Sequence, residues 1–231
     1  MNLTQLLDRV RSYFSTLNRQ RRYKTLSRLD VFDEIFLKKT WTANLKNIPV
    51  SGVGSSLNQT ITARSTVEFV LKKYQIRSIV DIGCGDFTWM HEMNLEGINY
   101  TGVDIVEKLI EENRILYGTP QKTFLTLDIC MDKIPTADLV ICRDCLVHLS
   151  LPEIQMALKN IRESKSGYLL ATTFSGVAEN KNIVTGLWRP VSLDLPPFDF
   201  RKPIFYALED AQDSGFYKIK KQLGFWKLEG I

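Results

Sequence analysis

The 231-residue sequence predicts an α/β fold, in which helices cover both faces of a mostly parallel β-sheet. Two observations favour this class. From residue 76 to residue 174, short apolar runs alternate with helical patterns, which is the order of β-α-β units. After residue 203, two further apolar runs are separated by polar residues, and such a pair indicates an antiparallel hairpin at one edge of the sheet.

The first part of the chain predicts a helical extension. Residues 1–40 carry apolar side chains at helical spacing and a basic cluster that runs from Arg19 to Arg28. Such a cluster is typical of a solvated helix face, and an anionic membrane or an RNA is its alternative partner. Residues 47–58 are rich in Gly, Ser and Asn, as loops are. We therefore expect an N-terminal extension over residues 1–58 and a second domain over residues 59–231.

The second domain begins with a helix that Thr60 can cap and that reaches about Tyr74. The strands expected after this helix cover residues 78–82, 100–103, 122–127, 137–142, 167–174, 204–208 and 224–228. The helices expected between the strands cover residues 87–93, 105–117 and 151–163. In a sheet of this kind, ligands bind beside the carboxyl ends of the strands.

A glycine turn follows the first strand, where residues 79–87 read IVDIGCGDF. The dinucleotide fingerprint G-x-G-x-x-G fails here, because Thr88 occupies the position of the third glycine. Asp86 would repel a pyrophosphate at the start of the next helix, whereas it can accept a hydrogen bond or face an ammonium group. The turn therefore favours S-adenosylmethionine, which has no phosphate, over a nicotinamide dinucleotide.

Acidic residues also end the second and third strands. Asp104 lies about 20 residues beyond the glycines, where an acid can bind ribose hydroxyls. Asp128 precedes Ile129, so that its carboxylate can accept from an adenine amino group while the isoleucine packs on the ring. A single acid of this kind is more often a capping or turn residue. Three of them in succession, with Asp86, favour a nucleoside site.

These segments together resemble the class I S-adenosylmethionine-dependent methyltransferases. The matching stretches are VDIGCGD, YTGVDI, FLTLDI and ADLVICRDCLVHL, over roughly Ile76 to Phe174. A narrower likeness, to mostly bacterial small-molecule methyltransferases that are often linked to surface-glycan assembly, rests on G-x-G-S, on Gln59, Thr60 and Arg64, on CRDCLVHLS and on TGLWRP. The resemblance implies a Rossmann-like, doubly wound sheet of seven strands, mostly parallel with an antiparallel last strand.

Carried over position by position, the resemblance implies S-adenosylmethionine as the cofactor and no metal ion. The implied cofactor-binding residues are Arg64, Asp81, Gly83, Gly85, Asp104, Ile105, Asp128, Ile129 and Arg143. Arg64 could grip the cofactor carboxylate with two parallel hydrogen bonds, although a surface helix arginine is its alternative. The superfamily often has a third glycine where Phe87 stands, and the narrower group shares this phenylalanine.

Two polar residues after the fourth strand are candidates for catalysis. Methyl transfer to oxygen or nitrogen requires alignment of the acceptor, exclusion of water and a group that takes a proton. His148 is the candidate base, because an unperturbed imidazole titrates near neutral pH. Asp144 is the competing candidate, or the group that orients His148. A packing role beside the next helix is the alternative for the histidine.

A long segment rich in proline and aromatic residues, 182–200, follows the fifth strand, and connections of this size are usually functional. Within it, Trp188 could form the floor of the acceptor site and Arg189 could bind the acceptor, with the guanidinium favouring a phosphate or a carboxylate. Trp41 could close the site from the other side. Simple packing is the alternative for both tryptophans.

The sequence thus predicts a methyltransferase acting on oxygen or nitrogen of a small soluble acceptor: a sugar, a nucleotide-sugar or a small phosphorylated amine. Methylation of RNA or protein, and cofactor binding without catalysis, are the alternatives. The formal net charge is only +4, so a nucleic-acid partner is not expected. Apolar runs stay well below the roughly 20 residues of a membrane span, and charges break the N-terminal stretch, so we expect a cytoplasmic protein. The oligomeric state stays open.

The four cysteines are interpreted as reduced, structural thiols, because three of them end apolar runs. Cys142 and Cys145 form a C-x-x-C pair, for which a redox or metal role is the alternative.

Overall fold

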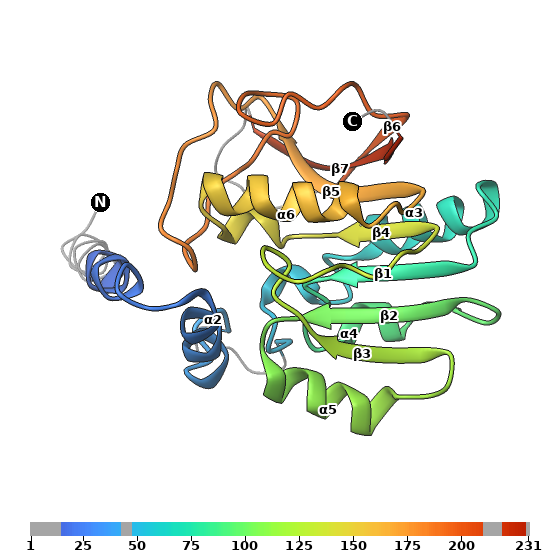
Figure 1. Ribbon diagram of the computed structural model, residues 1–231, viewed down its shortest axis with the longest axis horizontal. Helices are drawn as coiled ribbons and strands as arrows, with labels where there is room; N and C mark the ends of the chain where they lie inside the picture. Colours follow the sequence, from blue (N-terminus) through green and yellow to red (C-terminus); the bar gives the residue numbers. More distant parts are fainter. Residues whose placement is uncertain (1–14, 43–47, 210–218, 230–231) are drawn as a thin grey trace.

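The computed structural model describes residues 15–42, 48–209 and 219–229, and its centre is one seven-stranded sheet (Figure 1). The strand order is β3-β2-β1-β4-β5-β7-β6. The strands are β1 Ser78–Ile82, β2 Asn99–Asp104, β3 Lys122–Thr126, β4 Leu139–Cys142, β5 Tyr168–Ser175, β6 Phe205–Leu208 and β7 Lys220–Lys227. The first five strands are parallel, and β7 pairs antiparallel with both β5 and β6. This topology confirms the predicted fold class.

Helices cover both faces of the sheet, as expected. The helices are α2 Arg28–Leu37, α3 Ile61–Lys73, α4 Thr88–His91, α5 Glu107–Tyr117 and α6 Leu151–Glu163, with 3₁₀ turns η1 Val53–Ser55 and η2 Leu146–His148. Side chains of α3, α4 and α5 pack on one face of the sheet, and side chains of α6 pack on the other. Segment 191–200 completes the second layer. All four residues of β4 are buried, because a strand covered on both faces has no solvent side.

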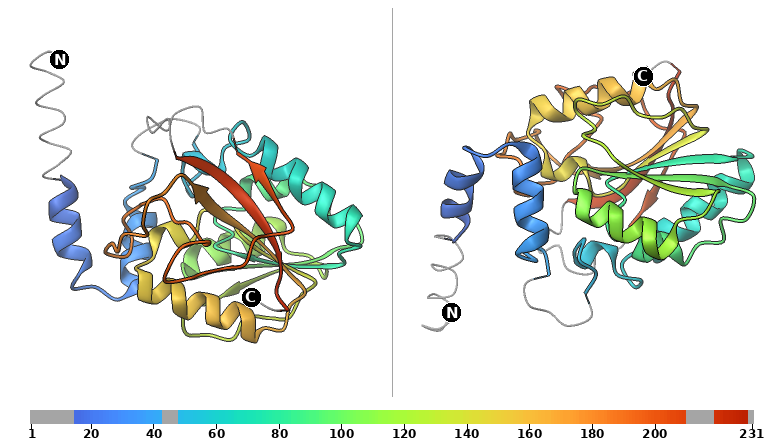
Figure 2. Two further views of the ribbon diagram at one scale, coloured as in Figure 1. Left: turned by 90° about the horizontal axis from the view of Figure 1, so that it is seen from above. Right: turned by 60° about the horizontal axis from the view of Figure 1, so that its bottom comes forward.

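The N-terminal extension lies beyond the carboxyl ends of the parallel strands (Figure 1). There α2 stands across the end of the sheet, and the helical residues 15–23 lie farther out (Figure 2). The side chain of Ser27 caps α2 by accepting a hydrogen bond from the backbone N–H of Asp30, at 3.1 Å. The expected helix over residues 1–14 lies outside the described residues. Among the described helices, none is long and apolar enough to cross a membrane.

Local signals fix some element ends better than others. Helix α6 has the predicted bounds, because Ser150 and Glu153 form a capping box at its start. Thr60 was expected to cap α3, but its hydroxyl instead donates to the carbonyl of Ser56, at 3.0 Å. The helix expected over residues 87–93 is shorter. Strand β7 begins four residues earlier than expected, because its polar first residues still pair through the backbone with β5.

Candidate active site

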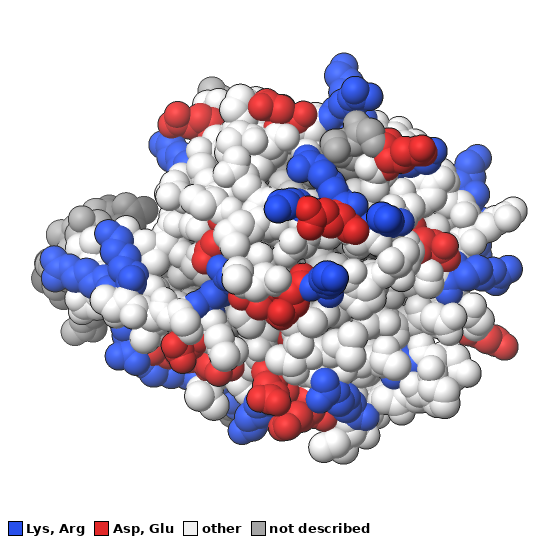
Figure 3. All heavy atoms as spheres, viewed as in Figure 1, with Lys and Arg blue, Asp and Glu red and all other residues white. Residues whose placement is uncertain are grey.

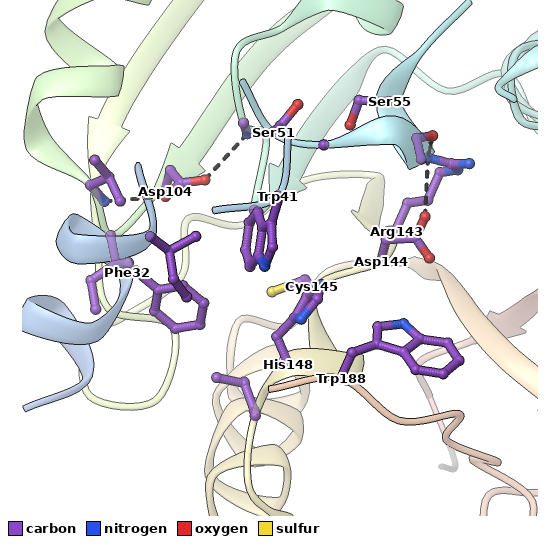
Figure 4. Close-up of a pocket in the computed structure, with 18 of the residues that line it drawn as sticks. Phe32, Trp41, Ser51, Ser55, Asp104, Arg143, Asp144, Cys145, His148 and Trp188 are labelled. Carbon is purple, nitrogen blue, oxygen red and sulfur yellow. Dashed lines mark hydrogen bonds and ion pairs between the residues drawn. The ribbon is translucent and has the colours of Figure 1, made fainter. Parts of the chain in front are cut away.

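A cavity of about 440 Å³ lies at the carboxyl ends of the strands, where the strand order reverses between β1 and β4. Its size is within the range of small-molecule sites. One part, here the glycine end, is lined by Gly83, Gly85, Asp104, Ile105, Asp128 and Ile129. The other part, here the histidine end, is lined by Asp144, Cys145, His148, Trp188 and Pro190. In Figure 4, Asp104 and Trp188 lie on opposite sides, with Trp41 and Cys145 between them.

The glycine turn presents bare backbone to the cavity. Gly83 and Gly85 both have positive φ angles, 68° and 58°, which favour glycine. The N–H of Gly83 donates to the carbonyl of Val103 at 2.9 Å, which fixes the turn on β2. A Cβ atom at Gly85 would lie 2.7 Å from the Cβ of Ser51. Glycine is therefore required here because a neighbouring loop rests directly on the turn.

That loop, residues 48–59, is called the front loop below, and Asp86 holds it in place. The carboxylate of Asp86 accepts hydrogen bonds from the Ser51 hydroxyl at 2.9 Å and from the Ser51 N–H at 3.2 Å. Asp86 thus accepts hydrogen bonds, as the sequence suggested, but its partner is the chain itself. The adjacent Phe87 has a φ of 58° and is fully buried against Tyr100 and Phe124, so an aromatic side chain stabilises a position where glycine would be easier.

Asp104 and Asp81 have different surroundings. Asp104 lines the cavity, and its two oxygens accept from the N–H groups of Gly85 and Val106, at 3.2 and 3.1 Å. Each oxygen keeps acceptor capacity for a ligand hydroxyl. Asp81 lies outside the lining and accepts from the Tyr100 hydroxyl at 2.8 Å. Burial raises the pKa of Asp81 to about 7, and it also raises the pKa of Asp104.

Asp128 at the end of β3 is held by an arginine of the N-terminal extension. Arg28 donates to the Asp128 carboxylate from Nε at 3.0 Å and from Nη2 at 2.7 Å, and its Nη1 also pairs with Glu153. The N–H of Cys130 supplies a further hydrogen bond to Asp128, at 2.9 Å. Ile129 lines the cavity beside this group. In the sequence, Arg28 is only one member of a basic cluster.

Four charged residues form a network at the far side of the histidine end, in which each cation contacts both acids. The cations are Arg143 and Lys221, and the acids are Asp144 and Glu209. Arg143 Nε donates to Glu209 at 2.9 Å, and Lys221 contacts both Asp144 and Glu209. Burial alone would raise the pKa of Asp144, but Lys221 and Arg143 outweigh burial and hold that pKa below its usual range. Asp144 is therefore an ionised partner in this network, which makes it a weak base.

Arg143, predicted to lie beside the cofactor or the acceptor, lines the cavity but is bound by the protein itself. In addition to Glu209, its Nη1 donates to the carbonyl of Gly54 at 2.8 Å. Its guanidinium lies 5.7 Å from the centre of the Trp89 ring. The residue thus joins the front loop to the end of β4. Its partner Glu209, and Lys221, which shares Glu209 with it, were missed by sequence reasoning because nothing near them in the chain marks them.

His148 is fixed by contacts on two sides. Its Nδ1 lies 3.0 Å from the carbonyl of Leu187, and since a carbonyl can only accept, Nδ1 carries the proton and Nε2 keeps its lone pair. The ring stacks on Trp41, with 4.5 Å between ring centres. Burial lowers the pKa of His148 to about 4. The ring is thus a neutral hydrogen-bond acceptor, oriented by Leu187 and Trp41 rather than by Asp144.

The two predicted acceptor contacts of segment 182–200 differ. Trp188 lines the cavity, is 52% exposed and packs edge-on against Phe174. Arg189 is buried outside the lining, and its guanidinium donates to the carbonyls of Leu146, Val147 and Leu149, at 3.1, 2.9 and 2.7 Å. These contacts leave little of the guanidinium for a substrate. Arg189 instead braces the turn η2, which carries His148.

Arg64 and the C-x-x-C pair differ in their relation to the cavity. Arg64 is half-buried on α3 and does not line the cavity, so its contact with a cofactor carboxylate stays a prediction. The thiol of Cys145 lines the cavity, whereas Cys142 is buried beneath it. Over the described ranges, no cluster of three His, Cys, Asp or Glu side chains could hold a metal ion.

Known proteins share this fold and part of this sequence. Residues 79–164 match the family described as "Methyltransferase domain". Magnesium protoporphyrin IX methyltransferase (ChlM) from Synechocystis PCC 6803, with bound SAM, superposes with a TM-score of 0.60 at 17% identity, covering 88% of this chain and 99% of that chain. The 1,6-didemethyltoxoflavin-N1-methyltransferase of Burkholderia thailandensis gives a TM-score of 0.61 at 13% identity, covering 86% and 87%.

A third solved structure is the N-methyltransferase NodS from Bradyrhizobium japonicum WM9, in complex with S-adenosyl-l-homocysteine. Its TM-score is 0.59 at 11% identity, covering 83% of this chain and 97% of that chain. No curated protein matches the sequence. At these identities the structural likeness establishes the fold, and the matching domain family covers the segment from the glycine turn to α6.

Proposed function

We propose that this chain, a class I S-adenosylmethionine-dependent methyltransferase, transfers a methyl group to an oxygen or nitrogen atom of a small soluble acceptor. The observation that supports this proposal is the continuity of the cavity. It joins bare glycine backbone and a strand-end carboxylate at one end to a neutral, oriented imidazole at the other. A donor and an acceptor bound in one cavity react as if within one molecule, which is the main requirement of methyl transfer.

The residues of the glycine end fit the cofactor. Asp104 keeps acceptor capacity for ribose hydroxyls, and Gly83 and Gly85 leave room for the aminocarboxypropyl group. Ile105 and Ile129 supply apolar contacts for a purine ring. When bound, S-adenosylmethionine supplies a methyl group that the positive sulfur has already activated.

At the histidine end, we assign His148 to the acceptor. Its Nε2 can accept a hydrogen bond from an acceptor hydroxyl or amine and so direct the acceptor lone pair. With a pKa lowered to about 4 by burial, His148 is too weak a base to ionise a free hydroxyl. It receives the proton only as the new bond to the methyl carbon makes that proton acidic. Trp41 and apolar residues of helix α2 line the cavity, and we assign to them the exclusion of water that the transfer requires.

Among the predicted acceptors, we favour an uncharged sugar hydroxyl over a phosphorylated compound. The described lining holds three cations, and each already has acidic partners: Arg28 contacts Asp128, while Arg143 and Lys221 share Glu209. An acceptor phosphate would have to compete with these ion pairs. The face drawn in Figure 3 carries basic and acidic side chains side by side, which suits a small molecule better than a nucleic-acid backbone.

The first test is calorimetry of the purified protein with S-adenosylhomocysteine and, separately, with NAD. We expect binding of the former only, and binding of NAD alone would refute the cofactor assignment. Sugars, nucleotide-sugars and small phosphorylated amines are then screened with S-adenosylmethionine by mass spectrometry. We expect His148→Gln to lower kcat by about 10–100-fold and to leave the Kd of S-adenosylhomocysteine unchanged.

The matched control is His91→Gln, because His91 is exposed on α4 and does not line the cavity. This control variant should keep the wild-type kcat. An unchanged rate in His148→Gln would show that the imidazole has no part in the transfer.

A further inference from the structure

Arg28 connects the N-terminal extension to the glycine end of the cavity. It is the first residue of α2, its side chain is 14% exposed, and it makes a two-point contact with Asp128, 100 residues away in sequence. Two-point arginine–carboxylate pairs fix the orientation of the carboxylate as well as its charge. The same guanidinium reaches Glu153, which caps α6. The rotation of the Asp128 carboxylate is therefore restrained from outside the core of the domain.

The contacts of Asp128 leave room for one more donor. A carboxylate offers about four acceptor positions. At Asp128, Oδ1 accepts from the N–H of Cys130 and from Arg28 Nε, while Oδ2 accepts from Arg28 Nη2 at 2.7 Å and shares the Nε hydrogen at 3.1 Å. Three N–H groups thus meet about four acceptor positions, which leaves one for a further donor, and Asp128 lines the cavity together with Ile129. An amino group on an aromatic ring packed against Ile129 has the chemistry to occupy that position.

The rest of α2 depends on the same contact. Phe32, Ile35 and Phe36 line the cavity from one side of the helix, at helical spacing from Arg28. After the helix, Trp41 stacks on the ring of His148. The segment from residue 28 to residue 41 is thus attached to the body at both ends, once at each end of the cavity.

We propose that Arg28 is a positioning residue for the cofactor: it holds Asp128 with one acceptor position open for the exocyclic amino group of adenine. This inference rests on the proposed function, since it assigns the purine of S-adenosylmethionine to that position. It also makes the N-terminal extension part of the cofactor site rather than an appendage at residues 1–58.

The test compares two ligands that differ at the purine amino group. S-adenosylhomocysteine carries it, whereas S-inosylhomocysteine has a carbonyl oxygen there instead. We expect the wild-type protein to bind the adenosyl ligand at least about tenfold more tightly, the usual effect of one hydrogen bond to a charged acceptor. In Arg28→Gln the two affinities should approach each other, because the Asp128 carboxylate is free to turn. Arg28→Lys keeps the charge without the two-point contact and should lose most of the preference as well.

The control variant is Arg22→Gln, which removes another arginine of the extension, one that pairs with Glu34 away from the cavity. It should keep the wild-type preference, and thermal unfolding confirms that each variant is folded. A proportional loss of affinity for both ligands in Arg28→Gln would mean that Arg28 only docks α2, which overturns the positioning role. An unchanged preference overturns it too. A wild-type protein that binds neither ligand refutes the proposed function instead.

Discussion

The glycine end and the histidine end of the cavity use their polar groups differently. At the glycine end, Asp104 is fixed by backbone N–H groups and still turns acceptor capacity toward the cavity. At the histidine end, Asp144 is neutralised by Lys221 and Arg143. The first arrangement suits a polar ligand that is always the same, such as a cofactor. At the second, the charged side chains bind one another, and the imidazole and the aromatic faces are left to contact an acceptor.

The largest expected effect comes from Arg189, which braces the turn η2 at the histidine end. Arg189→Met removes the three hydrogen bonds from the guanidinium to η2 and its C-cap. The carbonyls of Leu146 and Val147 keep backbone donors, whereas that of Leu149 loses its guanidinium donor, and an unsatisfied buried carbonyl costs about 1–3 kcal/mol. With the two other hydrogen bonds also lost, we expect the free energy of unfolding to fall by about 2–4 kcal/mol in urea titrations. Because His148 sits on this turn, kcat should fall too, while the Kd of S-adenosylhomocysteine stays near the wild-type value.

Arg21→Met is the matched control, because Arg21 is exposed on the outer helix. Its unfolding free energy should change by less than about 0.5 kcal/mol. An equally small change in Arg189→Met would show that water replaces the guanidinium, and the bracing role would then be refuted.

The second effect concerns the glycine end alone. Asp104→Ala removes the carboxylate that we assign to the ribose hydroxyls, and two hydrogen bonds to a charged acceptor are lost. We expect the Kd of S-adenosylhomocysteine to rise about 100-fold, as measured by calorimetry. The variant Asp81→Asn should change this Kd far less, since Asp81 lies outside the lining. A larger effect from Asp81→Asn would place the cofactor deeper than the cavity allows.

The third effect is the pH dependence of the free energy of unfolding. His148 at the histidine end and Asp81 beside the glycine end shift this free energy in opposite directions as the pH changes. The pKa of His148 falls to about 4 on burial, so the unfolded chain binds more protons between pH 4 and 6.5, and stability is lost as the pH falls. The pKa of Asp81 rises to about 7, so the folded chain binds more protons and stability is lost as the pH rises. From pH 7 to pH 5 each contribution amounts to about 2 kcal/mol, and the two nearly cancel.

Variants separate these two contributions. With His148→Gln, the free energy of unfolding should increase by about 2 kcal/mol or more as the pH is lowered from 7 to 5, because the contribution of Asp81 is no longer opposed and the raised pKa of Asp104 acts in the same direction. With Asp81→Asn it should decrease by a similar amount over the same range. Urea titrations at the two pH values measure both changes. Identical slopes in the two variants would contradict the assignment.

The same contrast explains how far sequence reasoning reached. The glycine turn, Asp104, Ile105 and Ile129 could be predicted to line the cavity because each lies at, or within three residues of, the carboxyl end of a strand, and parallel strands end at one edge of the sheet. The seven strands and the antiparallel last strand followed from the same alternation together with the family resemblance. Element bounds were accurate where a capping box marks them, as at α6, and shifted where backbone pairing continues through polar residues, as in β7.

Contacts between charged residues far apart in the sequence could not be predicted in this way. Glu209 meets Arg143 across 66 residues, and the pair forms only because β4 and β6 end, and β7 begins, at the same edge of the sheet. Arg28 meets Asp128 across 100 residues, and nothing in the basic cluster distinguishes this arginine from the others. The local pattern TGLWRP did mark a functional segment. It could not show which of two adjacent residues faces the cavity and which faces the backbone.

That last distinction leads to the smallest expected effect. Trp188 is half exposed and touches Phe174 edge-on, so Trp188→Ala should change the unfolding free energy little. Loss of an aromatic face for the acceptor is worth about 1 kcal/mol, so we expect KM to rise about five- to tenfold with kcat unchanged, using the sugar that is turned over in the screen. Trp188→Phe keeps a ring and should restore most of the affinity. A fall in kcat or in affinity for S-adenosylhomocysteine would instead show that Trp188, like Arg189, supports the structure of the histidine end.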